Sequence, residues 1–116
     1  MNLYVCQIDL KQEAKALAFA NALDIWMSHL QNKGTIHSWQ LYRRKLNLAS
    51  DTFRDFELLI EVENLSQLDL AFHLSGQQND DIQDMHNAVH NLIATSDFGL
   101  FRPFPDPERS ERLALL

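Results

Sequence analysis

Cysteine, glycine and proline are scarce in this chain of 116 residues, which contains one cysteine, three glycines and three prolines. A single cysteine excludes an intramolecular disulfide and a zinc site built from the thiolates of one chain. The glycines are widely separated, so the sequence contains no glycine-rich phosphate-binding loop. No apolar run reaches the ~18 residues typical of a membrane-spanning helix. We therefore expect no membrane partner.

Positive charge is also scarce. The chain contains 10 lysines and arginines and 16 acidic residues, which gives a net charge of −6. The only dense basic cluster, Arg43 to Lys45, is too small for a nucleic-acid-binding stripe, and we expect no nucleic acid partner. The amino terminus does not show the basic-then-apolar layout of a signal peptide. A cytoplasmic location is therefore expected.

Apolar residues make up 46% of the chain, which is enough for one hydrophobic core. We expect a single domain over residues 1–106 and a tail over residues 107–116 without a core of its own. Cys6 lies in an apolar strand pattern, where a free cysteine behaves as a small hydrophobe rather than as a nucleophile.

Hydrophobic periodicity predicts the first two elements. Residues 2–10 alternate as a strand, with Tyr4, Cys6, Ile8 and Leu10 on the buried side. An amphipathic helix follows, because apolar residues then recur at spacings of three and four, at Ala16, Phe19, Leu23, Trp26 and Leu30. Gly34 suits the left-handed residue that ends such a helix.

The remaining elements are predicted in the same way. Two strands, 35–46 and 53–64, precede a short helix around Leu68, Ala71 and Phe72, which Asn64 or Ser66 can cap. A longer helix over 81–95 and a last strand over 98–104 complete the chain. Pro103 cannot donate a ladder hydrogen bond, so this strand should lie at a sheet edge or end there.

The strand over 35–46 carries apolar and polar residues on both of its sides. Trp39 and Leu41 are its bulkiest apolar pair, so their side should face the helices, with His37 and Arg43 pointing the same way. Tyr42 and Arg44 should face away, where Glu57 or Glu61 is expected to neutralise Arg44 next to a partner subunit.

This order predicts an α+β, ferredoxin-like β-α-β-β-α-β fold: a four-stranded antiparallel sheet with helices on one face. The other face would carry many apolar side chains, in a set made of Leu3, Val5, Gln7, Gln40, Tyr42, Glu57, Leu59 and Glu61. A monomer rarely exposes a broad patch of this kind. We therefore predict a homodimer joined through its sheet faces.

Three stretches, "IHSWQLYRRKL", "LSQLDLAF" and "LFRPFPDP", resemble a small bacterial family of unassigned function in the dimeric α/β-barrel superfamily. The resemblance covers nearly the whole chain and implies that fold. Enzymes of the superfamily, among them small monooxygenases, often place their pocket between sheet and helices. No active-site motif is recognisable here, so the resemblance assigns no catalytic residue.

His86 and His90 lie four residues apart on the last long helix, a spacing that can place two imidazoles on one metal. The glutamate of the metalloprotease motif does not follow His86, and we expect no metal site. His86 borders the apolar stripe of its helix. It is either a hydrogen-bonded boundary residue or a candidate general base facing a cleft.

Trp39, Arg43 and His37 are the candidate ligand-binding residues that accompany His86. In this hypothesis Trp39 forms a wall of a ligand pocket between sheet and helices, and Arg43 binds an anionic group of the ligand at the rim of that pocket. Each has a structural alternative, since Trp39 suits the core and Arg43 can extend into solvent. Arg102 is expected to pair with Asp106 or with an acid of a partner subunit.

The leading hypothesis is a small dimeric protein that binds or transforms a small apolar or aromatic molecule between sheet and helices, without a cofactor. One alternative is a non-catalytic dimeric module for protein interactions. Another is a haem- or metal-associated protein with His86 or His90 as ligand. The sequence leaves open whether the protein is an enzyme.

Overall fold

The computed structural model describes residues 1–46, 48–76 and 80–106. Its elements follow the order β1 (Asn2–Leu10), α1 (Ala16–Asn32), β2 (Ser38–Arg43), β3 (Phe56–Val62), α2 (Leu65–Ser75), α3 (Asp80–His90) and β4 (Ile93–Phe101). The two helices predicted after residue 64 appear as α2 and α3. The tail predicted over 107–116 lies outside the described residues.

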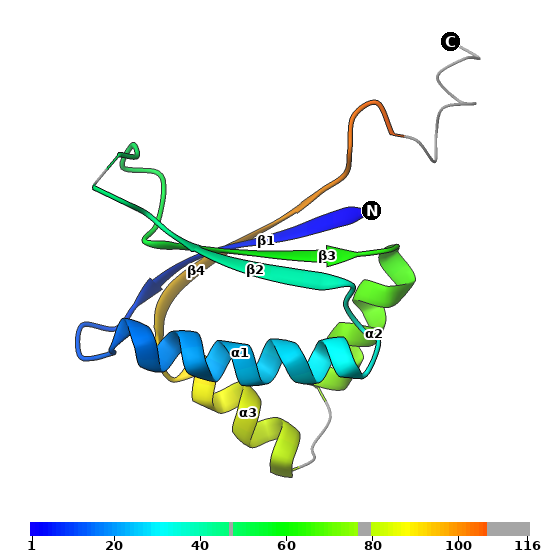
Figure 1. Cartoon of the computed structure of the whole chain (residues 1–116), viewed down its shortest axis with the longest axis horizontal. Coiled ribbons are helices and arrows are strands. Elements are labelled where there is room, and N and C mark those ends of the chain that lie inside the picture. The colour runs from blue at the N-terminus through cyan, green and yellow to red at the C-terminus, as the bar shows by residue number, and fades with distance from the viewer. Residues whose placement is uncertain (47, 77–79, 107–116) are drawn as a thin grey trace.

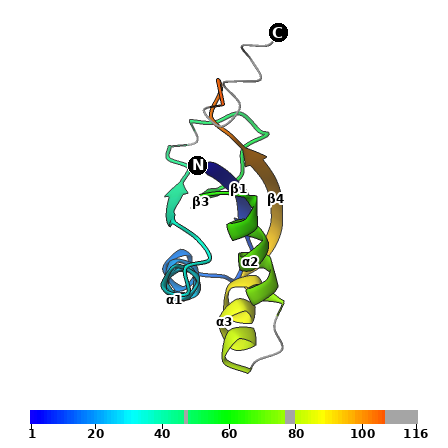
Figure 2. The same cartoon turned by 90° about the vertical axis from the view of Figure 1, so that its right-hand side faces the viewer.

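Within the described residues the strands form one four-stranded antiparallel sheet in the order β2-β3-β1-β4. The helices lie on one side of this sheet (Figure 1), with α1 beneath its β2 side and α2 and α3 beneath its β4 side (Figure 2). The predicted ferredoxin-like fold is confirmed. As expected, β4 lies at the edge and ends at Phe101, before Pro103.

The hydrophobic core lies between the sheet and the helices. It contains the predicted face of α1, with Phe19, Leu23, Trp26, Met27 and Leu30 buried. In β2, Trp39 pairs with Ile60 and Leu41 pairs with Leu58, and both β2 side chains pack against this core. The predicted orientation of Trp39 and Leu41 is therefore confirmed.

The end of α1 explains why β2 begins later than predicted, at Ser38 rather than at residue 35. Gly34 has a φ of 72°, its N–H donates to the carbonyl of Gln31 at 3.0 Å, and the N–H of Thr35 donates to Leu30 at 3.1 Å. This pair of bonds is the Schellman arrangement that a left-handed glycine permits. The buried Thr35 hydroxyl also donates to the Leu30 carbonyl, so Thr35 closes the helix instead of starting the strand.

Other predicted boundaries also require correction. The sequence extended β3 to 53–64, β2 to residue 46 and α3 to residue 95, whereas the strands and α3 are shorter. The predicted strand over 98–104 instead spans 93–101, because Ile93 pairs with Leu10 and Thr95 pairs with Asp9. Pairing with β1 therefore overrides the helical pattern after His90. The predicted cap of α2 is confirmed at Asn64, whose side chain accepts from the Gln67 N–H at 2.8 Å.

Candidate functional site

A cavity of about 270 Å³ lies between the sheet and the helices. Strands β1, β3 and β4 supply one wall, and α1, α2 and α3 supply the other. The buried part of the lining is almost wholly apolar and consists of Cys6, Ile8, Leu23, Trp26, Met27, Leu30, Ile36, Leu58, Ile60, Leu68, Ala71 and Val89. The fold therefore provides an apolar space large enough for a small organic molecule.

Few polar groups reach this cavity. They come from Tyr4, Ser75, His86, His90 and Ser96, together with the Cys6 thiol. The Ser75 hydroxyl donates to the Ala71 carbonyl within its own helix. Burial raises the pKa of the Cys6 thiol to about 12, so the thiolate does not form at neutral pH and Cys6 is a buried hydrophobe, as predicted.

His86 is the half-buried histidine of the cavity wall and the candidate there for acid–base chemistry. Its ring meets the Trp26 ring edge-on, with centroids 5.6 Å apart, and lies 4.0 Å from the His90 ring. Burial, and secondarily the charge of His90, lower the pKa of His86 below its usual value of 6.5. At neutral pH, His86 therefore presents a neutral imidazole to the cavity, which is the form that accepts a proton.

We predict that His86 titrates below pH 6.5 in the folded protein and that His90→Gln raises this pKa. The glutamine removes the neighbouring positive charge but leaves His86 half-buried, so the pKa should remain below its usual value. NMR titration of the imidazole resonances measures both values. An unchanged His86 pKa in His90→Gln would show that the two rings are not electrostatically coupled.

The other candidate residues lie away from this cavity. Trp39 borders a shallow hollow next to Ala20, and Arg43 lies over the Phe56 ring with its guanidinium carbon 5.4 Å from the ring centroid. His37 is exposed, 3.8 Å from a carboxylate oxygen of Glu63. The structure thus places His86 in the cavity lining and separates it from the three predicted companions.

The sequence also predicted no metal site, no membrane-spanning helix and a partner for Arg102. Among residues 1–46, 48–76 and 80–106, no group of three or more histidine, cysteine or acidic side chains gathers in a way that could hold a metal ion. No helix in the same ranges is long and apolar enough to cross a bilayer. Arg102 pairs with Asp106 at 3.4 Å, as predicted, and its Nε donates to Asn2 at 3.2 Å.

The open face of the sheet is divided into an apolar and a polar half. Cross-strand pairs place Leu3 next to Phe101, and Val5 next to Leu59 and Gly99. Phe101 and Tyr42 are each at least half exposed on this face. The predicted set of outward residues is therefore correct, and β4 adds Phe101 to it.

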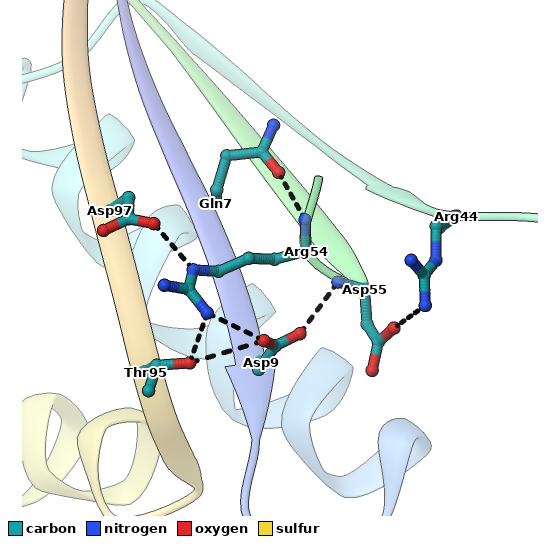
Figure 3. Close-up of polar contacts among 7 residues, drawn as sticks. All are labelled: Gln7, Asp9, Arg44, Arg54, Asp55, Thr95 and Asp97. Carbon is teal, nitrogen blue, oxygen red and sulfur yellow. Dashed lines mark hydrogen bonds and ion pairs between the residues drawn. The ribbon is translucent and has the colours of Figure 1, made fainter. Parts of the chain in front are cut away.

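The polar half is centred on Arg54, which reaches from the loop before β3 across β1 to β4 (Figure 3). Its Nη1 donates to Asp9 and to Thr95 at 2.9 Å, and its Nε donates to Asp97 at 2.7 Å. The backbone N–H of Asp55, followed by Arg54, holds the pKa of Asp9 below its usual value although burial opposes this. These hydrogen bonds connect the loop before β3 to the inner strand β1 and to the edge strand β4.

The predicted ion pair of Arg44 was wrong. Arg44 pairs with Asp55 of its own chain at 2.8 Å (Figure 3), whereas the sequence suggested Glu57 or Glu61 near a partner. Glu57 instead accepts from the Gln7 side chain at 2.8 Å. Because Arg44 and Arg54 are both neutralised within the chain, the polar half can face a second subunit without leaving either cation unpaired.

Comparisons with known proteins concern the family and the fold of this chain. Residues 1–116 match the model of a family described as "Family of unknown function (DUF6614)". No curated protein matches the sequence. The predicted resemblance to a family of unassigned function is confirmed by this family match, and solved structures that match most of the chain share its fold.

Three of these structures illustrate the likeness. SnoaB, a cofactor-independent oxygenase from Streptomyces nogalater, is 13% identical, with a TM-score of 0.65 and coverage of 90% of this chain and 97% of that chain. A dimeric ferredoxin-like protein of unknown function from Thermobifida fusca is 11% identical, with a TM-score of 0.60 and coverage of 86% and 88%. A dimeric protein of unknown function from Bacteroides fragilis is 10% identical, with a TM-score of 0.57 and coverage of 86% and 93%. At these identities the likeness shows the fold alone.

Proposed function

We propose a function for this chain, which belongs to the family of unknown function DUF6614: it is a homodimeric protein that binds a small apolar or aromatic molecule in the cavity between its sheet and its helices. The observation that carries the proposal is the cavity itself. The side chains that line this space of about 270 Å³ lack packing contacts that they would have in a solid core. A ligand restores the missing contacts.

His86 gives this cavity a possible chemistry. A neutral imidazole in an apolar wall can accept a hydrogen bond, or a proton, from a hydroxyl or other weakly acidic group of the ligand. Burial, which lowers the pKa of His86, keeps the ring ready for this role near neutral pH. The similarity to SnoaB, described as a cofactor-independent oxygenase, agrees with chemistry that relies on protein side chains. We assign His86 the role of candidate base, with no cofactor.

The homodimer in this proposal forms through the open faces of the two sheets. Leu3, Val5 and Leu59 are only half-buried there, and Phe101 is 58% exposed. A second copy would cover this apolar half. The neighbours from T. fusca and B. fragilis, which are described as dimeric, support a dimer. The cavity lies on the opposite side of the sheet, so each subunit would keep its own ligand site.

The test uses Ala71→Phe, which projects a ring from α2 into the cavity. Ala71 is 6% exposed and lines the cavity. With 1-naphthol as the probe, isothermal titration calorimetry should show binding to the wild type and binding weaker by roughly tenfold or more in the variant. Ala88→Phe, at an exposed position of α3, is the matched control and should bind like the wild type.

Stability separates the two possible reasons for a loss of binding. If the space is a cavity, the added ring fills it and the free energy of unfolding changes little. In a solid core the same ring would cost about 1–3 kcal/mol. Undetectable binding of 1-naphthol to the wild type, together with strong destabilisation of Ala71→Phe, would contradict the proposed function.

A further inference from the structure

Three aromatic side chains from three different elements meet at one side of the cavity. Tyr4 of β1, Phe72 of α2 and Phe98 of β4 all line it. Tyr4 is half-buried, whereas Phe72 and Phe98 are 52% and 59% exposed. Most of the lining is buried, so these exposed rings mark where the cavity reaches the surface. We name this group the aromatic mouth.

The rings of the aromatic mouth have a definite arrangement. Tyr4 and Phe98 are almost parallel, with an interplanar angle of 15° and centroids 5.9 Å apart. Phe72 stands nearly perpendicular to Tyr4, at 84° and 5.6 Å. Tyr4 and Phe98 lie on adjacent strands, where Cys6 pairs with Phe98 and Tyr4 pairs with Leu100. Sheet register therefore aligns the two rings.

Aromatic rings attract one another in offset-stacked or edge-to-face geometry, at centroid separations of about 4.5–7 Å. The near-parallel planes of Tyr4 and Phe98 suit stacking with a flat ligand ring. Phe72, perpendicular to Tyr4, suits an edge-to-face contact with the same ring. A saturated ring system is thicker, because its hydrogens stand above and below the carbon skeleton, and it has no π face. It therefore gains burial but not these contacts.

We infer that the aromatic mouth of Tyr4, Phe72 and Phe98 selects a flat aromatic ligand over an aliphatic molecule with the same carbon skeleton. This inference rests on the proposed function, because it assigns a ligand class to the same cavity. Phe72 and Phe98 are then specificity-determining residues. Among the ring contacts that the structure describes, neither of them contacts His86.

The experiment compares two probes, 1-naphthol and decahydro-1-naphthol. They share a bicyclic carbon skeleton and a hydroxyl group that can donate a hydrogen bond to His86. The phenolic hydroxyl of 1-naphthol is the stronger donor, so the leucine variants below separate the ring contacts from this hydrogen bond. Only 1-naphthol is flat and aromatic. Calorimetric titration of the wild type should show at least about fivefold tighter binding of 1-naphthol, which corresponds to one favourable aromatic contact.

The variants are Phe72→Leu and Phe98→Leu, which keep an apolar side chain but remove the ring. Each variant should bind 1-naphthol about fivefold more weakly than the wild type does, and its affinity for decahydro-1-naphthol should be nearly unchanged. Phe53→Leu is the matched control, since Phe53 is 52% exposed in the loop between β2 and β3, outside this cavity. Its probe preference should equal that of the wild type.

The outcomes distinguish this inference from the proposed function. Equal affinity of the wild type for both probes would overturn the aromatic mouth while supporting a general apolar cavity. Unchanged preference in both leucine variants would do the same. Binding of neither probe to the wild type would overturn the proposed function and the inference together.

Discussion

Leu59→Glu is expected to convert the proposed dimer into monomers. Leu59 lies on the open face of β3, where it pairs with Val5 of β1 and Gln40 of β2. A glutamate there would place an uncompensated carboxylate in the proposed interface. Burying such a charge costs several kcal/mol, so the dimer should weaken by about a hundredfold or more.

Sedimentation at micromolar concentration measures this effect. The wild type should sediment at about twice the 13.5 kDa chain mass, and Leu59→Glu should sediment near that mass. Leu17→Glu is the control, because Leu17 is 85% exposed on α1, on the other side of the sheet. A monomeric wild type would contradict the dimer.

Trp26→Ala is expected to lower the free energy of unfolding by about 3–5 kcal/mol. Trp26 is 4% exposed in the middle of the buried face of α1, and its ring packs against His29 and His86. The substitution removes the largest side chain of this face and enlarges the space already present beside it. A loss of that size is a large fraction of the stability of a small domain.

Denaturant titration of the wild type and the variant gives this free energy difference. Trp39→Ala provides a comparison, since Trp39 is only half-buried and should lose less. A cost below about 1 kcal/mol for Trp26→Ala would contradict the role of Trp26 in the core.

The sequence predicted the fold because its strongest patterns are local. The spacing of Phe19, Leu23 and Trp26 specifies one helix face, and the alternation of Phe56, Leu58 and Ile60 specifies one sheet face. The structure confirms both. Boundaries were less predictable, since Ile93 and Thr95 become strand residues only through pairing with Leu10 and Asp9 of β1.

The site was only partly predictable for the same reason. The position of His86 beside an apolar stripe is a local property, and the structure places it in the cavity lining. The aromatic mouth depends on how β1, β4 and α2 pack, because Tyr4, Phe72 and Phe98 are distant in sequence. Arg54 meets Asp9 and Asp97 only through the register between β1 and β4. The cytoplasmic location remains a prediction from the sequence.

The most direct test of the central claim is a high-resolution crystallographic map from crystals soaked in 1-naphthol. We expect density for the probe between the sheet and α3, next to Trp26, with its hydroxyl within hydrogen-bonding distance of His86 and its rings against Phe72 or Phe98. A map in which side chains fill that space, with no density for the probe there, would contradict the proposed function.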